Sequence, residues 1–134
     1  MKSTIAIYLE DNPNFTTFTS LVKYSTLYQE LDQIKDITVM ALPNRVFQEM
    51  GPASFTQLIN EERHIIKGII AHHMIASKYR AKDLVHGARI RMMTGSEVTI
   101  YNKDGILRFN SSLVTKPDIC LENGVLHIVN SMLI

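Results

Sequence analysis

Cysteine is almost absent from this 134-residue sequence, and tryptophan is missing altogether. The one cysteine, Cys120, has no second cysteine in the chain with which to form a disulfide or share a metal ion. A disulfide scaffold and a cysteine-rich zinc site within this chain are therefore excluded. A single cysteine is compatible with both reducing and oxidising compartments, so it does not identify the location.

Long apolar runs are also lacking. A membrane-spanning helix needs about 20 apolar residues, and the longest apolar stretch, Ile65 to Ile75, is interrupted by a lysine, a glycine and two histidines. Residues 1–11 are no signal peptide, because their apolar part is short and runs directly into Glu10 and Asp11. The sequence is therefore that of a cytosolic protein or of the mature region of an exported one.

No charge of one sign dominates. The 14 Lys and Arg residues nearly balance the 13 Asp and Glu residues, and the two signs are interspersed. A nucleic-acid partner is not expected, since duplex binding needs a basic stripe. The apolar share of 46% and the charged share of 20% are typical of a globular protein. The length fits one domain, residues 1–134.

The first half of the sequence has the spacing of helices around one strand. A helix is expected from Asn12 to Val22, because Asn and Pro open it and apolar residues follow at helical spacing. The β-branched run Ile37–Ala41 predicts a buried strand, and Asn44 is expected to cap a short helix after it. A capping box at Ser54 and an apolar stripe from Ile65 to His73 predict two further helices.

The second half changes to the two-residue period of strands. Strands are expected over residues 89–93, 98–101, 106–109, 113–115 and 125–129, separated by turn residues. Asn123-Gly124 is the strongest hairpin signal, because both residues tolerate the positive φ of a type I′ turn. Residues 119–121 should then run antiparallel to 125–129. Helices followed by an antiparallel meander predict the α+β class.

Three stretches, in order, resemble the motifs of the fasciclin domain family. The opening stretch, residues 37–47, has a buried strand, a proline, an Asn and a Phe. The central stretch, 69–75, places His72-His73 where the family usually has Tyr-His. The closing stretch, 123–130, reads Asn-Gly-Val-Leu-His-Ile-Val-Asn and is the most specific. The motif residues expected to have structural roles are Asn44, Phe47, His73, Asn123, Gly124 and His127.

The resemblance covers nearly the whole chain and implies a fasciclin-type α+β fold, with a helical N-terminal half packed on an antiparallel β-sheet wedge or sandwich. It implies a location outside the cytoplasm, since such domains occur on secreted, cell-surface, periplasmic or lipid-anchored proteins, often in tandem. It also implies a domain excised from a longer exported protein. The expected partners are proteins or glycans of a cell surface, matrix or envelope, with membrane association only through parts outside this chain.

The histidines raise the question of a metal site. His64 precedes His72 and His73 by about two helical turns, which is not ligand spacing, and no acidic residue stands at the nearby i+4 positions. His73 falls on the apolar face and is expected to be buried and hydrogen-bonded to the closing segment, preferably to Asp118. His127 alternates with Val125 and should make one structural hydrogen bond. Neither a metal nor a cofactor is expected.

Residues 116–119 resemble the Glu-Pro-Asp-Ile segment that has been assigned to integrin binding in animal fasciclin domains. Pro117, Asp118 and Ile119 match that segment, whereas Lys116 reverses its first charge. A structural interpretation is favoured, in which Pro117 lies at a sheet edge before the hairpin. The candidate binding residues are Lys116, Pro117, Asp118, Ile119, His72 and His73.

No catalytic constellation is found: the sequence has no nucleophile elbow, no phosphate loop and no cysteine-protease context. The function predicted is an extracellular or cell-surface adhesion or ligand-binding module without catalytic activity. Two alternatives stay open. One is an enzyme or metal-binding domain that uses the His72-His73 region, and the other is a structural spacer in a multidomain surface protein. A pocket lined by several titratable groups would favour the enzyme.

Overall fold

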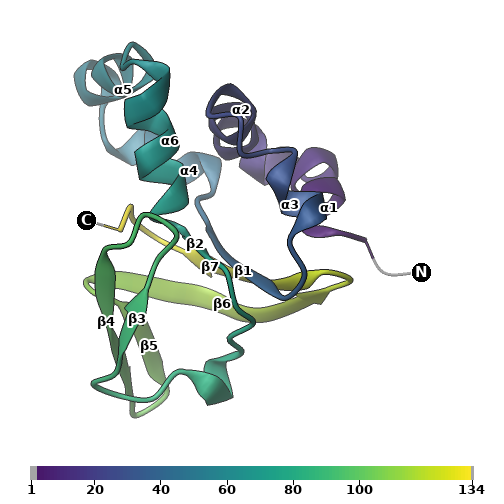
Figure 1. The fold of residues 1–134 in the computed structure, drawn as a ribbon. Helices are drawn as coiled ribbons and strands as arrows, with labels where there is room; N and C mark the ends of the chain where they lie inside the picture. The colour runs from purple at the N-terminus through teal and green to yellow at the C-terminus, as the bar shows by residue number, and fades with distance from the viewer. Residues whose placement is uncertain (1–2, 134) are drawn as a thin grey trace.

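The computed structural model describes residues 3–133, so three residues of the expected domain range 1–134 (1, 2 and 134) lie outside it. Figure 1 shows helices α1–α6 gathered on one side of strands β6 and β7, with strands β3–β5 on the other. The helices are α1 (Ile5–Asp11), α2 (Thr16–Tyr24), α3 (Glu30–Gln33), α4 (Asn44–Glu49), α5 (Pro52–Ile59) and α6 (Arg63–Ala71), with 3₁₀ turns η1 (Pro13–Phe15) and η2 (Ala81–Asp83). The strands are β1 (Ile37–Ala41), β2 (Met74–Ile75), β3 (Arg89–Arg91), β4 (Glu97–Lys103), β5 (Ile106–Phe109), β6 (Ser112–Leu121) and β7 (Gly124–Val129).

The strands form one seven-stranded sheet in the order β2-β1-β7-β6-β5-β4-β3. The α+β class is confirmed, and β1 and the five strands expected in the second half are all present, with β6 longer than expected. The sheet is not wholly antiparallel, because β1 runs parallel to β7 from the pair Ile37 and Gly124 to the pair Ala41 and Ile128. This parallel pair joins the helical half of the chain to the meander.

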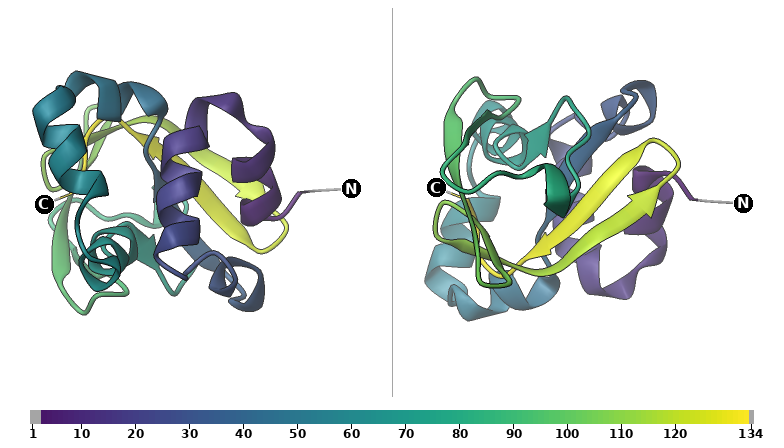
Figure 2. Two further views of the ribbon diagram at one scale, coloured as in Figure 1. Left: turned by 90° about the horizontal axis from the view of Figure 1, so that it is seen from above. Right: turned by 90° about the horizontal axis from the view of Figure 1, so that it is seen from below.

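The helices cover the sheet in two groups, α1–α3 and α4–α6, which lie beside each other when viewed from above (Figure 2). The core between helices and sheet is apolar, with Phe15, Phe18 and Leu31 from the helical side meeting Met40 and Val129 from the strands. All five of these side chains are almost completely buried. The apolar stripe predicted within residues 12–22 therefore lies in this core, as expected for an amphipathic helix.

The helical half contains one helix that was not predicted and one wrong prediction of a helix start. Helix α1 was not predicted, and it begins after Thr4, whose side chain accepts a hydrogen bond from the Ile7 N–H. Ser54 caps no helix, because α5 already begins at Pro52, immediately after Gly51 in a left-handed conformation (φ 88°). Proline fits the first helical turn because its missing N–H would have no partner there.

The closing hairpin is confirmed, but its turn is not the expected one. Ile119 pairs with Leu126 and Leu121 pairs with Gly124, antiparallel. Neither Asn123 nor Gly124 has a positive φ, which a type I′ turn would require, so the turn is of another type. Glycine is required at 124 for a different reason: a Cβ there would collide with the carbonyl oxygen of Ile37 on β1. Gly124 thus permits the close approach of β7 to β1.

Candidate functional site

His73 is the second residue after the end of α6 and is completely buried. Its Nδ1–H donates to the Ile69 carbonyl at 2.8 Å, and its Nε2 accepts from the Leu133 N–H at 3.0 Å. This tautomer follows from the partners, because a carbonyl only accepts and a backbone N–H only donates. Burial lowers the pKa of His73 to about 4, so the ring is neutral near pH 7. The expected burial is observed, and the ring fixes the C-terminal segment against α6.

The preferred partner for His73, Asp118, was wrong. The exposed carboxylate of Asp118 accepts instead from the Ala81 N–H at 2.8 Å, while the Asp118 N–H donates to Nδ1 of His127 at 3.1 Å. The Nε2–H of His127 donates to the Tyr79 carbonyl at 2.8 Å. His127 therefore makes two hydrogen bonds rather than one. Burial is the main cause that lowers the pKa of His127, against the opposing effects of Tyr79 and Asp118.

The segment Lys116–Ile119 lies in an irregular part of β6. Lys116 pairs with Ile128 and Ile119 pairs with Leu126, with register shifts on either side of Lys116. Neighbouring β5 pairs with β6 through Ser112 and Leu113. Pro117 lies beyond those pairs and is exposed, as expected for a proline at a sheet edge. Lys116 and Asp118 are also exposed, and Ile119 is half-buried.

Asn44 does not cap its own helix, which was a wrong prediction: it is the first residue of α4, and Pro43 occupies the cap position. Its Oδ1 accepts from the Thr17 N–H at 3.1 Å, and its Nδ2 donates to the Pro13 carbonyl at 3.0 Å. The side chain also bonds the Thr16 hydroxyl. Asn44 therefore caps helix α2 from outside and ties α4 to it. Phe47, the other residue of that motif, is buried and contacts Phe55 edge-on.

Asn123 has a similar long-range role. Its Oδ1 accepts from the Ile5 N–H at 3.0 Å, its Nδ2 donates to the Leu31 carbonyl, and its own carbonyl accepts from the Ile37 N–H at 3.1 Å. One side chain at the hairpin turn thus anchors α1 and α3. The sequence pattern Asn-Gly predicted only a turn at Asn123. It could not predict these partners, because a turn pattern carries no information on distant residues.

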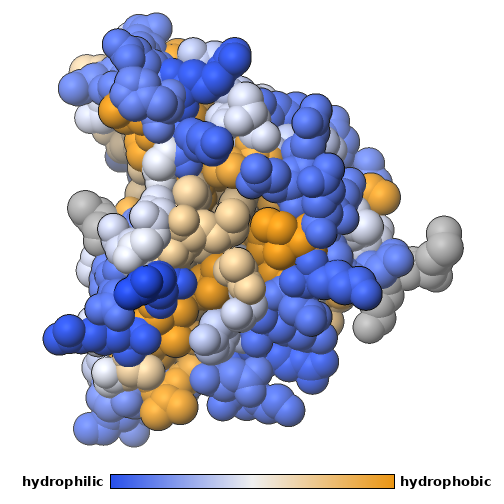
Figure 3. All heavy atoms as spheres, in the orientation of Figure 1, coloured by the Kyte–Doolittle hydropathy of each residue, from blue (hydrophilic) through white to orange (hydrophobic). Residues whose placement is uncertain are grey.

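A cleft runs between α6, the β3–β4 loop and the C-terminal segment, and we call it the α6 cleft. It encloses about 660 Å³, a size typical of ligand sites. Its lining residues are His64, Ile65, Gly68, Ile69, His72, Thr94, Ser96, Met132 and Leu133. No carboxylate is among them. Figure 3 shows apolar residues reaching the surface in the hollow between helices and strands on one face of the molecule.

The two neighbouring histidines have different places at this cleft. His72 is half-buried in its lining, and its Nδ1 lies 3.2 Å from the Thr94 hydroxyl. Burial lowers the pKa of His72 as well. His73 lies behind the lining, where it holds Leu133 in place. Sequence reasoning found both histidines but missed Thr94, Ser96 and Met132, because only the folded chain brings them to α6.

Within residues 3–133, no three His, Cys, Asp or Glu side chains converge as a metal ion would need. The described helices include none with the length and apolar character to cross a membrane. The candidate residues do not form one site: His72 and His73 belong to the α6 cleft, whereas Lys116–Ile119 lie on the hairpin.

The sequence model for the Fasciclin domain matches residues 13–134. The chain belongs to the fasciclin domain family. This fasciclin domain is 24% identical over 134 residues to the uncharacterized protein sll1735 of Synechocystis, covering 100% of this chain and 98% of that protein. It is also 24% identical over 127 residues to human periostin, covering 93% of this chain but only 15% of periostin.

A solved structure has the same fold. It is a FAS1 domain pair from the insect cell adhesion molecule Fasciclin I, with a TM-score of 0.81 and 19% identity. The likeness covers 98% of this chain and 51% of that chain, so this fasciclin domain spans about half of the solved pair. The match confirms the fold expected from the sequence motifs.

Proposed function

We propose that this fasciclin domain is a non-catalytic adhesion module that works outside the cytoplasm and binds a partner protein through the α6 cleft. The observation that carries the proposal is the lining of the cleft. Ile65 is exposed and Ile69 and Met132 are half-buried, so they offer an open apolar surface, with the buried Leu133 beneath them and Thr94 and Ser96 as polar groups at its side. Exposed apolar surface of this kind marks interaction sites, because burying it against a partner removes it from water.

The geometry of the histidines favours binding over catalysis. A general base needs a free nitrogen within reach of a substrate. Both nitrogens of His73 are engaged by backbone groups, and the ring is fully buried behind the cleft. His72 is accompanied in the lining by His64 but by no carboxylate that would orient it or share a proton. The interpretation of this region as an active site therefore has less support.

The relatives support adhesion and the use of several domains together. The solved structure with this fold belongs to a protein named as an insect cell adhesion molecule, and it contains a pair of such domains. A single cleft of this size gives weak binding, whereas tandem copies gain from high effective concentration. The proposed location outside the cytoplasm, like the proposed partner from a cell surface, matrix or envelope, rests on membership of the family.

The test compares two exposed isoleucines. Ile65 in the cleft is 42% exposed and Ile106 on β5 is 39% exposed, so I65S and I106S remove similar apolar surface at different places. The domain, alone and in tandem, is immobilised and presented with cells and matrix from its source. I65S should abolish adhesion of the tandem form while I106S retains it. Equal adhesion of I65S and wild type, or turnover of a substrate that H72A abolishes, would overturn the proposal.

A further inference from the structure

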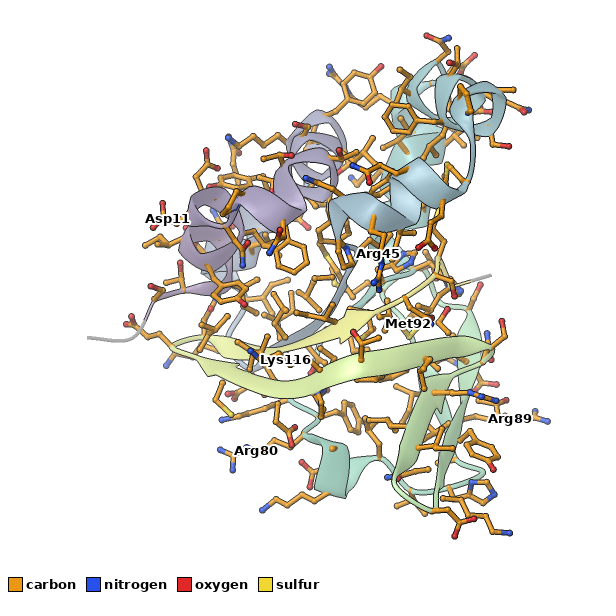
Figure 4. All side chains as sticks on the ribbon, turned by 180° about the vertical axis from the view of Figure 1, so that it is seen from behind. Asp11, Arg45, Arg80, Arg89, Met92 and Lys116 are labelled. Atoms are coloured by element: carbon orange, nitrogen blue, oxygen red, sulfur yellow. The ribbon has the colours of Figure 1, made fainter. Side chains whose placement is uncertain are left out.

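A second hollow lies on another side of the molecule, between α1, α4 and the β6–β7 hairpin. It encloses about 590 Å³. Its lining residues are Tyr8, Asn12, Asn14, Phe15, Pro43, Asn44, Arg45, Gln48, Lys116 and Ile128. Figure 4 shows Arg45 projecting from α4 toward the hairpin and Lys116 on the hairpin below it. We call it the Arg45–Lys116 hollow.

The lining of the hollow is positively charged. Its lining contains two cationic side chains and no carboxylate. Among the ion pairs of residues 3–133, Lys116 has none, and Arg45 has one, with Glu49 at 3.5 Å. That pair is an exposed i,i+4 contact, with both side chains 62% exposed, so it costs little to replace. Lys116 can therefore bind an anion directly, and Arg45 can do so by exchanging its weak pair with Glu49.

Neutral polar groups surround the two cations. The side chains of Asn14 and Gln48 and the hydroxyl of Tyr8 make no hydrogen bond within the described chain, and the amide nitrogen of Asn12 is likewise unused. Asn44 differs, because its amide is fully engaged with η1 and α2 and so forms a fixed wall. The ring of Tyr8 lies 6.2 Å from that of Phe15, which holds it in place.

This combination selects a class of ligand. Two cations bind carboxylate or sulfate groups, and Arg does so with two parallel hydrogen bonds. Amides that both donate and accept suit the hydroxyl groups of a sugar, and an aromatic ring offers an apolar face to a sugar ring. The volume lies within the range of small-ligand sites, ~300–1,000 Å³. A simple inorganic anion would leave most of the hollow and its amides unused.

We propose that the Arg45–Lys116 hollow binds an acidic saccharide, a short stretch of glycan that carries carboxylate or sulfate groups. The site is separate from the α6 cleft, and it adds a glycan partner to the protein partner proposed there. Arg45 and Lys116 bind the acidic groups, while Asn14 and Gln48 bind hydroxyl groups.

The experiment uses the whole chain and three hexasaccharides: oligogalacturonate with carboxylates, heparin hexasaccharide with sulfates, and neutral maltohexaose. Titration calorimetry and amide chemical shifts are recorded for wild type and for R45Q/K116Q. The matched control is R89Q/K103Q, which removes the same charge from exposed positions on β3 and β4, and Figure 4 shows Arg89 far from both cations. Gln48→Glu adds a carboxylate to the hollow at an exposed helical position.

At least one acidic probe should bind, with shifts clustered around the hollow, and maltohexaose should bind at least tenfold more weakly. R45Q/K116Q and Q48E should each weaken the acidic probe at least tenfold, whereas R89Q/K103Q should change it less than twofold. I65S should leave saccharide binding unchanged, which separates this proposal from the one for the cleft. Binding of neither acidic probe would overturn the proposal, as would equal losses in R45Q/K116Q and R89Q/K103Q.

Discussion

Acidification should destabilise this fasciclin domain well above the pH at which carboxylates titrate, and His73 is the main cause. Its ring is completely buried and accepts a hydrogen bond from the Leu133 N–H, so a proton on Nε2 would remove an acceptor and create a buried charge. The folded-state pKa is about 4, against 6.5 for an ordinary histidine. Because the folded pKa is depressed, protons bind preferentially to the unfolded chain.

The size of the effect follows from these two pKa values. Well above pH 6.5 both states are neutral and His73 contributes nothing to the pH dependence. As the pH falls from about 6.5 toward about 4, the unfolded chain takes up a proton that the folded chain refuses. At 1.36 kcal/mol for each pKa unit, the free energy of unfolding falls by about 2 kcal/mol between pH 7 and pH 5, and by about 3 kcal/mol near pH 4. Below that pH the folded chain is protonated too, and the loss stops growing.

Urea unfolding followed by circular dichroism at pH 7, 6 and 5 measures this loss while most carboxylates stay ionised. The control is H73Q, because a glutamine amide both donates and accepts but does not titrate. H73Q should cost ~1–3 kcal/mol at pH 7 through imperfect hydrogen bonds. Its stability should then fall much less between pH 7 and 5, with His127 and His72, whose pKa values are also lowered by burial, responsible for the remainder. An unchanged pH dependence in H73Q would refute the reasoning.

Three further substitutions test long-range contacts. Gly124→Ala should prevent the approach of β7 to β1, so thermal unfolding should show a strongly destabilised or unfolded domain. The control is Gly68→Ala in α6, where a Cβ meets open space, and it should be neutral or stabilising by ~0.5–1 kcal/mol. Asn44→Ala should lower the free energy of unfolding by ~1–3 kcal/mol, because its hydrogen bonds to η1 and α2 are lost. Gln48→Ala on the same helix is the control and should lower it by less than ~0.5 kcal/mol. Asn123→Ala should lower hydrogen-exchange protection in α1 and α3 more than in β4, and uniform loss would contradict an anchoring role.

The sequence was most informative where one local pattern determines the outcome. Strand Ile37–Ala41 has its predicted bounds because a short β-branched run is unlikely to fit any other element. The stripe from Ile65 to His73 places α6 correctly, because an apolar face at helical spacing is typical of an amphipathic helix. Only part of that face is buried, since Ile65 and Ile69 line the open α6 cleft. The N-terminal helix α1 was missed. It is only seven residues long, and it is anchored by a hydrogen bond to Asn123 in the hairpin, which its own sequence pattern does not reveal.

Predictions failed where the answer depends on distant residues. The motif pattern located Asn44 and His73 correctly, yet their partners come from α2 and the C-terminal segment. Local spacing cannot reveal such partners, because hydrogen bonds between elements are fixed only when the whole chain packs. The Arg45–Lys116 hollow is a further case: its two cations are far apart in sequence, and no motif joins them.

The parallel pairing of β1 with β7 has a consequence for how the chain folds. β1 belongs to the first third of the sequence and β7 to its last residues, so their register from Ile37 with Gly124 to Ala41 with Ile128 closes a very long loop. Loops of this kind cost entropy before any contact compensates, which slows folding. During synthesis, one edge of β1 therefore has no partner strand until β7 has been made. β7 then completes the sheet between β1 and β6, and a chain truncated before Gly124 has no partner for that edge of β1.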